Sequence, residues 1–435
     1  MSPLMLAVRG AVSTLTARDR ESLFDRATSS SDAIRDRTAE IVAQVRSGGD
    51  AALRALAERF DGVRLASLEV PRAACDAALA ALDPALRHSM ERAITNISAV
   101  HHAFRPVATE ITTADGIVIG RRPDPLARVG VYAPGGRAAY PSSVLMGAVP
   151  ARVAGVRELI LCSPPGPDGR PSAVVLAAAS LAGVDRVFSL GGAGAVAAMA
   201  FGTESVPLVD RIVGPGNAYV AEAKAQVSSR VAIDSPAGPS ELLVLADASA
   251  SALVVARELL AQAEHDPLAA VVLVTTSADL ASAVEAELSW ILDEAPRAEI
   301  VRASLAARGA IVVATSLDEA IAFSDRWAAE HLSLMVRTED EAATLDRLRN
   351  AGTVFVGPSA SVAFGDYMTG ANHVLPTGGA ARSYSGLSTL DFVRWTTYQH
   401  IPLAAARSLA EDVGIFADAE GLPAHAAAAR QWRTA

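Results

Sequence analysis

The sequence predicts an α/β protein with two Rossmann-like parallel-sheet domains, a short N-terminal arm and an extended, mainly helical C-terminal tail. From residue 129, short apolar runs bounded by Gly and Pro alternate with alanine-rich helical segments. An Ala-Gly-Val triplet at 154–156 precedes the apolar run 159–162, and the same triplet at 182–184 precedes the run 187–190. A buried strand that follows a helix ending at Gly is typical of a parallel sheet.

The remaining elements are predicted in chain order from the same periodicities. Residues 31–60 predict a helical hairpin broken at Gly48-Gly49, residues 83–104 a second helical region, and residues 111–118 a strand. After residue 240 the alternation returns, with apolar segments at 242–246, 271–275, 310–314, 332–336 and 353–356 and helices at 251–264, 278–294, 317–327 and 339–349. No strand is expected beyond residue 380, where a helical tail over 402–433 is too short to form its own core.

These elements predict a division of the chain into four parts. Residues 1–30 form an arm, and residues 129–240 form one Rossmann-like domain. Residues 31–128 and 241–380 together form the other domain, with the first segment returning to pack on it. Residues 381–435 form a tail that docks on the body of the protein or on another subunit.

The composition excludes several classes of function. The 435 residues include 38 basic and 48 acidic side chains, for a net charge of -10, and no Lys/Arg-rich run, so nucleic acid is not an expected partner. Cys75 and Cys162, the two cysteines, lie in apolar stretches without zinc-finger spacing, as in a reducing compartment. No apolar run reaches the roughly 18 residues that span a membrane, and the N-terminus lacks a signal-peptide pattern. We expect a cytoplasmic protein.

Gln262 and His265 are two potential metal ligands three residues apart at the end of a predicted helix. At that spacing both side chains leave the same face. A helix cap that meets solvent is the alternative, and for an isolated Gln-x-x-His it is the commoner case. Further nitrogen and oxygen donors elsewhere in the chain favour zinc, among them His425, which follows Glu420 by about one turn near the C-terminus.

Two other polar clusters lie in apolar surroundings. Asp366 and His373 share a Gly-bounded loop after the predicted strand 353–356, and loops at the carboxyl ends of parallel strands often carry sites. An Asx-type turn supported by the histidine is the alternative. Glu330 and His331 are either a satisfied core pair or a carboxylate beside a general base, with pKa values tuned by burial.

Four other histidines have no motif around them. His101 and His102 are adjacent on a predicted helix, so their side chains point in different directions and form no two-point ligand set. His88 and His400 are isolated.

Glycine-rich turns in residues 129–240 indicate a nucleotide site. Gly192-x-Gly194-x-x-Ala197 follows a predicted strand and opens a helix, which satisfies the dinucleotide fingerprint. The acidic residue expected about 20 residues later is represented only loosely, by Asp210. Further turns occur at 132–136 and 214–217, and three such turns at strand ends together suit a nucleotide.

Short motifs occur in a fixed order along the whole chain. They are GVYAPGG at 130–136, GPGNAYV at 214–220, PAGPSE at 236–241, QAEH at 262–265, AEHL at 329–332, GDY at 365–367, NHVLPT at 372–377 and AEGLPAH at 419–425. With these motifs the chain resembles the histidinol dehydrogenase family over essentially its whole length.

The resemblance implies a set of site residues. It implies one zinc per subunit held by Gln262, His265, Asp366 and His425, the last from the partner subunit of a homodimer that exchanges tails. It implies substrate contacts from these four ligands and from Ser240, His331, His373 and Glu420. It implies NAD contacts at Tyr132, Gly194 and Asn217.

The resemblance also implies a four-electron oxidation of L-histidinol to L-histidine with two NAD in succession, the last step of histidine biosynthesis. His331 takes the alcohol proton, and Glu330 activates the water that hydrates the retained aldehyde. One position departs from the family, which usually has Gln where this chain has Gly194. The departure puts the NAD pose in doubt and makes the Gly-x-Gly match partly accidental.

Two alternatives remain to be weighed. A paralogous enzyme could use the same zinc and base on another small alcohol such as dihydroxypropanesulfonate, but Glu420 would repel an anionic sulfonate and favours a cationic amino alcohol. A catalytically silent, zinc-stapled dimeric binding protein would need neither Glu330 nor His331.

Overall fold

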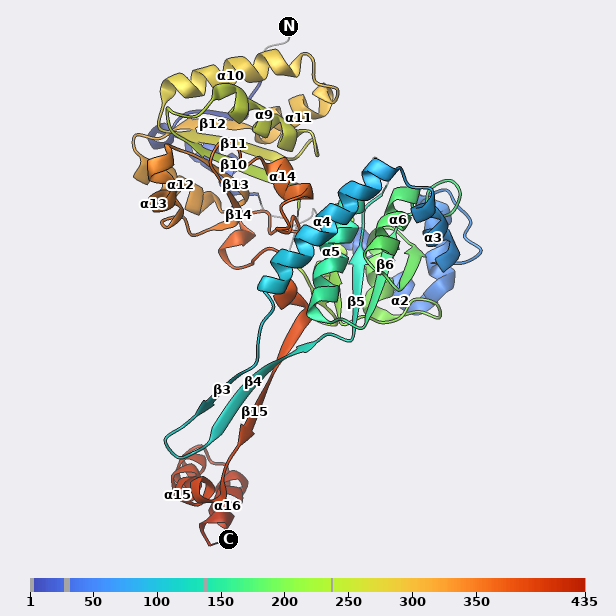
Figure 1. Ribbon diagram of the computed structural model, residues 1–435, viewed down its shortest axis with the longest axis vertical. Coiled ribbons are helices and arrows are strands. Elements are labelled where there is room, and N and C mark those ends of the chain that lie inside the picture. The colour runs from blue at the N-terminus through green and yellow to red at the C-terminus, as the bar shows by residue number, and fades with distance from the viewer. Residues whose placement is uncertain (1–3, 27–31, 136–138, 236–237, 435) are drawn as a thin grey trace.

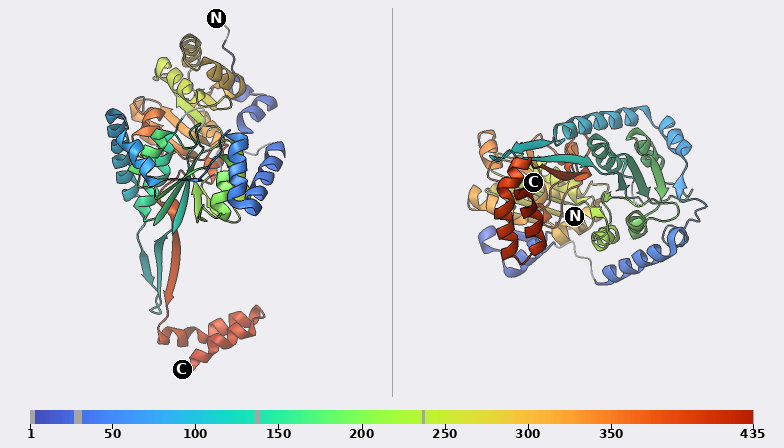
Figure 2. Two further views of the ribbon diagram at one scale, coloured as in Figure 1. Left: turned by 90° about the vertical axis from the view of Figure 1, so that its right-hand side faces the viewer. Right: turned by 90° about the horizontal axis from the view of Figure 1, so that it is seen from below.

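The computed structural model describes residues 4–26, 32–135, 139–235 and 238–434. Two α/β domains form a body, and a narrow β stalk carries a pair of helices away from it (Figures 1 and 2). Residues 1–3 and 27–30 of the expected arm, and parts of the motifs at 130–136 and 236–241, lie outside the described residues.

Sheet A is a six-stranded parallel sheet in the order β1-β12-β11-β10-β13-β14. Its strands are β1 (Val8–Ala11), β10 (Glu241–Ala246), β11 (Ala270–Thr275), β12 (Ala310–Val313), β13 (Ala329–Met335) and β14 (Ala351–Val356). Successive side chains of β10 alternate between two apolar clusters, Leu242 and Val244 on one face and Leu243 and Leu245 on the other. Both faces are therefore buried, as the continuous apolar runs predicted.

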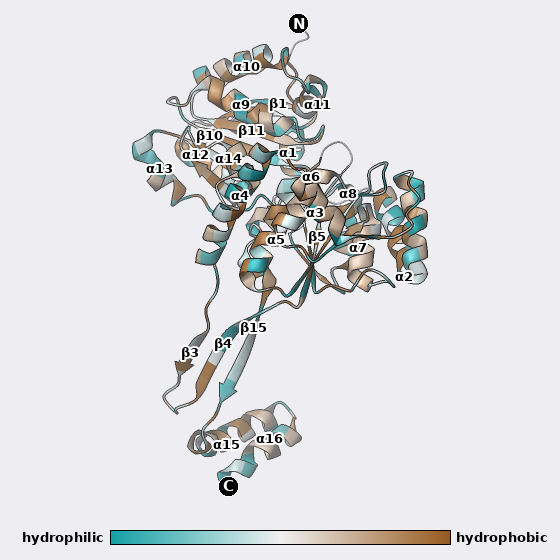
Figure 3. Cartoon of the chain, turned by 45° about the vertical axis from the view of Figure 1, so that its right-hand side comes forward, coloured by the Kyte–Doolittle hydropathy of each residue, from teal (hydrophilic) through white to brown (hydrophobic). Residues whose placement is uncertain are grey.

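Helices cover the two faces of sheet A (Figure 3). One face carries α9 (Ala252–Ala263), α10 (Ala278–Leu292), α11 (Ala298–Arg308) and α14 (Val362–Tyr367). The other face carries α1 (Ala17–Phe24) and α12 (Leu317–Trp327), and α13 (Thr338–Leu345) lies between β13 and β14 in the chain. The N-terminal arm is part of this domain, because β1 pairs with β12 and completes the sheet edge.

Sheet B has the order β2-β7-β6-β5-β8-β9, parallel except for β2. Its strands are β2 (Glu69–Val70), β5 (Arg128–Tyr132), β6 (Glu158–Ser163), β7 (Arg186–Ser189), β8 (Arg211–Val213) and β9 (Ala232–Ile233). The helices of its apolar clusters are α2 (Asp32–Phe60), α3 (Arg72–Ala80), α4 (Pro84–Ala103), α5 (Pro141–Ala154), α6 (Ala173–Leu181), α7 (Gly192–Phe201) and α8 (Ala218–Val227).

The expected placement of residues 31–128 with the domain of residues 241–380 is wrong. Helix α2 packs on α7 and α8, α3 on α6 and α4 on α5, while β2 pairs with β7. Leu53 and Leu56 of α2 share one apolar cluster with Phe188 and Met199 of the sheet B domain. The amphipathic pattern predicted these helices, but an apolar stripe does not specify which of two sheets it covers.

The stalk corrects two further expectations. Residues 111–118 were expected to form one strand, but the chain forms the hairpin β3 (Thr109–Thr112) and β4 (Val118–Pro125). Strand β15 (Val393–His400) pairs antiparallel with the whole of β4, although no strand was expected after residue 380. The tail beyond the stalk is helical as predicted, in α15 (Leu403–Ala419) and α16 (Pro423–Arg430).

His101 provides a test of the core beside α4. The side chain is 1% exposed, and neither ring nitrogen has a hydrogen-bond partner among the described residues. Burial lowers the pKa of His101 to about 4, so between about pH 6.5 and pH 4 the unfolded chain binds more protons than the folded one. We therefore expect the free energy of unfolding to fall by up to about 1.4 kcal/mol per pH unit as the pH drops through this window.

The variant His101→Leu should lose this component, so urea denaturation at pH 7 and pH 5 should show a smaller acid loss than in the wild type. His102→Leu is the matched control, because His102 is the exposed neighbour on the same helix. Equal acid losses in the wild type and His101→Leu would contradict the assignment.

Candidate functional site

The predicted catalytic residues lie at the amino edge of sheet A. Glu330 and His331 are the second and third residues of β13, and Ser240 directly precedes the neighbouring strand β10. These residues therefore lie at the amino ends of their strands, whereas Asp366 lies on a segment that follows the carboxyl end of β14 in the chain. Strands β10 and β13 are neighbours in sheet A. After β10 the chain continues to β11 and β12 on one side, and after β13 it continues to β14 on the other side. The candidate site therefore lies where the strand order reverses.

The main chain of Glu241 holds both predicted catalytic side chains. Its N–H donates to Oε2 of Glu330 at 2.7 Å, and its carbonyl oxygen lies 3.0 Å from Nδ1 of His331. A carbonyl only accepts, so in the neutral form of the ring this contact places the proton on Nδ1 and makes Nε2 the basic atom. Glu330 and His331 are 6% and 4% exposed, and their side chains approach to 3.4 Å.

A buried cation lies behind this pair. Arg26 Nη1 lies 2.7 Å from Oε2 of Glu241, both side chains are almost fully buried, and the guanidinium stacks 3.6 Å from the centre of the Trp327 ring. Gly378 N–H donates to the other Glu241 oxygen at 2.9 Å. Burial raises the pKa of Glu241 to about 7 although Arg26 opposes the shift, and the nearby Glu330 charge raises it further.

The candidate metal ligands of the body lie on two adjacent helices. The chain returns through α9 from the carboxyl edge to the amino edge of sheet A, so Gln262 and His265 arrive at the edge that carries Glu330. Glu258, one turn before Gln262, accepts from Val362 N–H at 3.0 Å, and Asp366 lies one turn after Val362. Gln262 and Asp366 therefore lie at the same height along the two adjacent helices, one turn beyond the contact between Glu258 and Val362.

Gln262 and Asp366 carry oxygen donors of the kind that bind metal ions. Asp366 Oδ1 lies 3.8 Å from Nε2 of His331, and the Gln262 side chain is 3% exposed with its amide nitrogen unpartnered among the described residues. Rotating that amide exchanges its nitrogen and oxygen, so the oxygen is available as a ligand. His265 follows α9 and is exposed. Within the described ranges no group of three or more His, Cys, Asp or Glu side chains is gathered closely enough to hold a metal.

His373 lies against the same cluster. Its Nδ1 is 2.9 Å from the carbonyl oxygen of Asp366, which leaves Nε2 for a ligand. Burial lowers the pKa of His373, although the Asp366 carboxylate opposes the shift. For His331 burial also lowers the pKa, but the carboxylates of Glu330 and Asp366 outweigh it and raise the value to about 9. A cation bound at Asp366 would reverse part of that increase.

The tail residues lie far from this cluster in the same chain. Glu420 caps the C-terminal end of α15 and His425 lies on α16, and both helices are at the far end of the stalk (Figure 1). Both residues are exposed and line one hollow of about 380 Å³, beside the apolar side chains of Val413, Phe416 and Leu422. The structure thus brings the two predicted tail residues together on one surface, but not to the ligands of the body.

The predicted NAD residues Tyr132 and Asn217 lie at the carboxyl edge of sheet B. Strands β5 and β8 are neighbours across the reversal of strand order, where open sheets bind nucleotides. The Tyr132 hydroxyl accepts from Gly192 N–H at 3.1 Å at the start of α7. Burial raises the pKa of Tyr132 to about 12, so the hydroxyl keeps its proton and can donate to a ligand. Asn217 caps α8 through its side-chain oxygen, which leaves its NH₂ group as a donor.

Gly194 faces helix α2. A Cβ atom at this position would lie 3.3 Å from Leu56 Cδ1 and 3.6 Å from Leu53 Cδ2, so a longer side chain would have to run along the contact between α7 and α2. The strand, turn and helix context of the fingerprint is as predicted. Asp210 is not its acidic residue, because it lies at the opposite edge of the sheet and accepts from Ala127 and Arg128 N–H, each at 2.9 Å.

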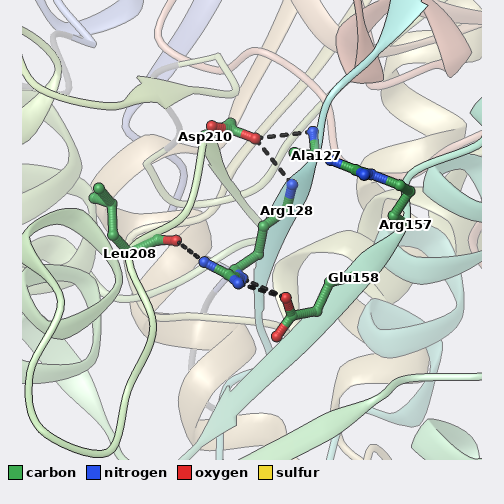
Figure 4. A pocket seen from close by; sticks show the side chains of 6 residues that line it. All are labelled: Ala127, Arg128, Arg157, Glu158, Leu208 and Asp210. Atoms are coloured by element: carbon green, nitrogen blue, oxygen red, sulfur yellow. Dashed lines mark hydrogen bonds and ion pairs between the residues drawn. The ribbon is translucent and has the colours of Figure 1, made fainter.

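A polar hollow of about 490 Å³ lies at this opposite edge (Figure 4). Arg128 pairs there with Glu158 at 2.6 Å and donates to the Leu208 carbonyl at 2.8 Å, while Asp210 receives two backbone N–H groups. These contacts satisfy the polar groups that Figure 4 joins by dashed lines, and they hold the amino ends of the strands together.

The chain is similar to known proteins over nearly its whole length. The sequence model of the family described as histidinol dehydrogenase matches residues 24–433. The chain belongs to the histidinol dehydrogenase family. The histidinol dehydrogenase of Methanosarcina barkeri is 48% identical over 90% of this chain and 90% of that protein. The histidinol dehydrogenase of Parasynechococcus marenigrum is 49% identical over 92% of this chain and 91% of that protein. The crystal structure of histidinol dehydrogenase from Elizabethkingia anophelis is similar at a TM-score of 0.93, with 33% identity, covering 100% of this chain and 99% of that one.

The match to histidinol dehydrogenases covers the sheet A and sheet B residues described above and the tail. The sequence did not predict the buried residues that hold Glu330, His331 and Gln262 in place. Glu241 is the last residue of the motif at 236–241, but no role was predicted for it. Arg26 lies in the N-terminal arm with no motif around it. Glu258 was visible only as an acidic residue one turn before Gln262. A carboxylate inside an otherwise apolar strand, as Glu241 is, was the available signal.

Removing the Glu241 carboxylate should destabilise the protein strongly. Glu241→Ala leaves Arg26 buried without its counter-charge, and breaking a buried pair in this way costs about 3–5 kcal/mol. Chemical denaturation of the variant measures this loss. Asp32→Ala is the control, because the Arg35–Asp32 pair is exposed and should be worth less than about 1 kcal/mol. Similar losses in the two variants would contradict the proposed weight of the buried pair.

Proposed function

We propose that this chain oxidises L-histidinol to L-histidine in two successive NAD-dependent steps at a zinc-containing site, the last step of histidine biosynthesis. The buried pair Glu330 and His331 carries the proposal, because Nε2 of His331 is left basic and faces the carboxylate of the candidate metal ligand Asp366. Family membership supports the same reaction. A dihydroxypropanesulfonate substrate is disfavoured by the acidic Glu420 beside His425 on the tail.

The residues divide the chemistry between them. Nε2 of His331 receives the proton of the substrate alcohol, while Nδ1 stays bound to the Glu241 carbonyl and keeps the ring oriented. Glu330 uses one oxygen to accept from Glu241 N–H and offers the other to the water that adds to the aldehyde. When bound, zinc would polarise the substrate oxygen and NAD would supply the hydride acceptor for each step. Gln262, His265, Asp366 and His425 would hold the metal, and Ser240, His373 and Glu420 would contact substrate.

For the cofactor, we assign contacts to Tyr132 and Asn217 and to the backbone at Gly194. The fit rests on a protonated phenol, a free amide NH₂ and the amino ends of α7 and α8, all at the carboxyl edge of sheet B. We also propose a cytoplasmic location, supported by Cys75 and Cys162, which are both buried and free. No helix among the described residues is long and apolar enough to cross a membrane.

The reaction is tested by stoichiometry. Purified protein with L-histidinol and excess NAD should form about two NADH per histidinol, and chelation should abolish turnover until zinc is restored. In Glu330→Gln the yield should fall towards one NADH, with aldehyde accumulating, because hydration loses its base. Glu339→Gln, an exposed acid at the start of α13, should keep the full yield. Failure of the zinc-loaded wild type to reach two would overturn the proposal.

We further propose that the functional unit is a homodimer in which each tail completes the partner's site. The stalk holds Glu420 and His425 away from their own body, and the tail exposes apolar side chains such as Phe416, which is 71% exposed. Such a two-helix segment has too little core of its own.

Subunit complementation tests the exchange. Asp366→Ala and His425→Ala should each be inactive, but a refolded mixture should recover about a quarter of wild-type activity, because half the dimers are hybrids with one complete site each. Mixing each variant with itself is the control. No recovery, with hybrids verified by mass spectrometry, would show that each tail serves its own chain.

A further inference from the structure

Lys224 is the only lysine in the chain. The sequence contains 38 basic residues, and the other 37 are arginines. Lysine is a compact point charge, whereas arginine carries a larger planar guanidinium, so the two side chains suit different buried sites. Lys224 lies in α8 and is only 4% exposed, whereas lysines are rarely buried without a specific partner.

The Lys224 ammonium closes a ring of contacts around Gly214. Nζ donates to the Gly214 carbonyl at 3.0 Å and pairs with Oδ1 of Asp234, which is 5% exposed. The second oxygen of Asp234 accepts from Gly214 N–H at 2.7 Å. One buried ion pair therefore satisfies both main-chain polar groups of Gly214. A planar guanidinium needs more room than this convergence of one carbonyl and one carboxylate offers.

Gly214 lies directly against Tyr132. Its φ of 118° is a conformation that favours glycine, and a Cβ atom there would lie 2.1 Å from the Tyr132 carbonyl oxygen. Asn217 caps α8 three residues later. The ion pair thus sets the spacing between the end of β5 and the turn after β8, at the point where the strand order of sheet B reverses.

We propose that Lys224 and Asp234 are positioning residues of the NAD site, which hold the 214–217 turn so that Asn217 and Tyr132 face the dinucleotide together. The inference rests on the NAD dependence proposed above. Neither side chain is assigned a contact with NAD. Their effect is to fix the 214–217 turn before NAD binds. No free energy of NAD binding is then spent on ordering the turn.

The test is equilibrium NAD binding to the full-length protein, measured by calorimetry without substrate. Lys224→Arg and Asp234→Asn should weaken NAD binding by about 10–100-fold, because a misplaced turn separates the contacts. The KM for histidinol should change less than about twofold, since sheet A is untouched. Amide hydrogen exchange should quicken at Gly214 to Val220, a change that an effect on overall stability alone would spread over the whole sheet.

If an unpaired buried charge prevents the single variants from folding, a double variant keeps the test decisive, and a separate variant serves as the control. Lys224→Met combined with Asp234→Leu removes both charges together and leaves no uncompensated ion, but it also removes the partners of Gly214. Arg128→Lys is the matched control, because it alters an ion pair at the opposite edge of the same sheet and should bind NAD as the wild type does. Folded Lys224 or Asp234 variants with wild-type NAD affinity would overturn the inference alone. A wild type that binds no NAD would overturn the proposed cofactor and the inference together.

Discussion

Two buried carboxylates, those of Glu241 and Glu330, lie on neighbouring strands, and the cation of Arg26 lies against one of them. Without a counter-charge, two anions in an apolar interior repel each other and lose their hydration. Arg26 and the N–H groups of Gly378 and Glu241 replace that hydration. The direction of the His331 ring then follows, because Glu241 binds Glu330 through its N–H and accepts from His331 through its carbonyl oxygen.

The two sheets contribute to the site with opposite edges. Sheet B presents its carboxyl edge, where glycine turns and helix starts suit a dinucleotide, while sheet A presents its amino edge, to which α9 and α14 return the candidate metal ligands. The segment between Met368 and His373 connects them, since Met368 accepts from Asn96 at 2.7 Å and Asn372 donates to the Met146 carbonyl at 2.8 Å. In the function proposed above, the hydride acceptor and the alcohol would therefore approach from different domains. Such an arrangement suits a reaction that exchanges the cofactor once while retaining the substrate.

The sequence predicted what depends on local periodicity and could not predict what depends on contacts distant in the chain. Strands such as β10 and β11 follow from continuous apolar runs, and Glu330 and His331 became candidate residues because polar groups interrupt such a run. The amphipathic pattern of α2 does not reveal that its partner is α7, and Arg26 meets Trp327 only through a contact spanning 301 positions. Strand β15 was missed although Val393, Trp395 and Tyr398 are good strand formers, because its partner β4 lies far earlier in the chain.

The stalk holds the tail at a fixed distance from the body and in a fixed orientation. Eight residues of β15 pair in unbroken register with β4, from Val393 opposite Pro125 to His400 opposite Val118, so the pair extends for roughly 27 Å. Tyr398 lies over Gly120, where any Cβ atom would meet its ring. An insertion of one residue in either strand would turn the following side chains to the other face. Substitutions within the tail helices should therefore displace the tail less than any change in the length of the stalk that carries them.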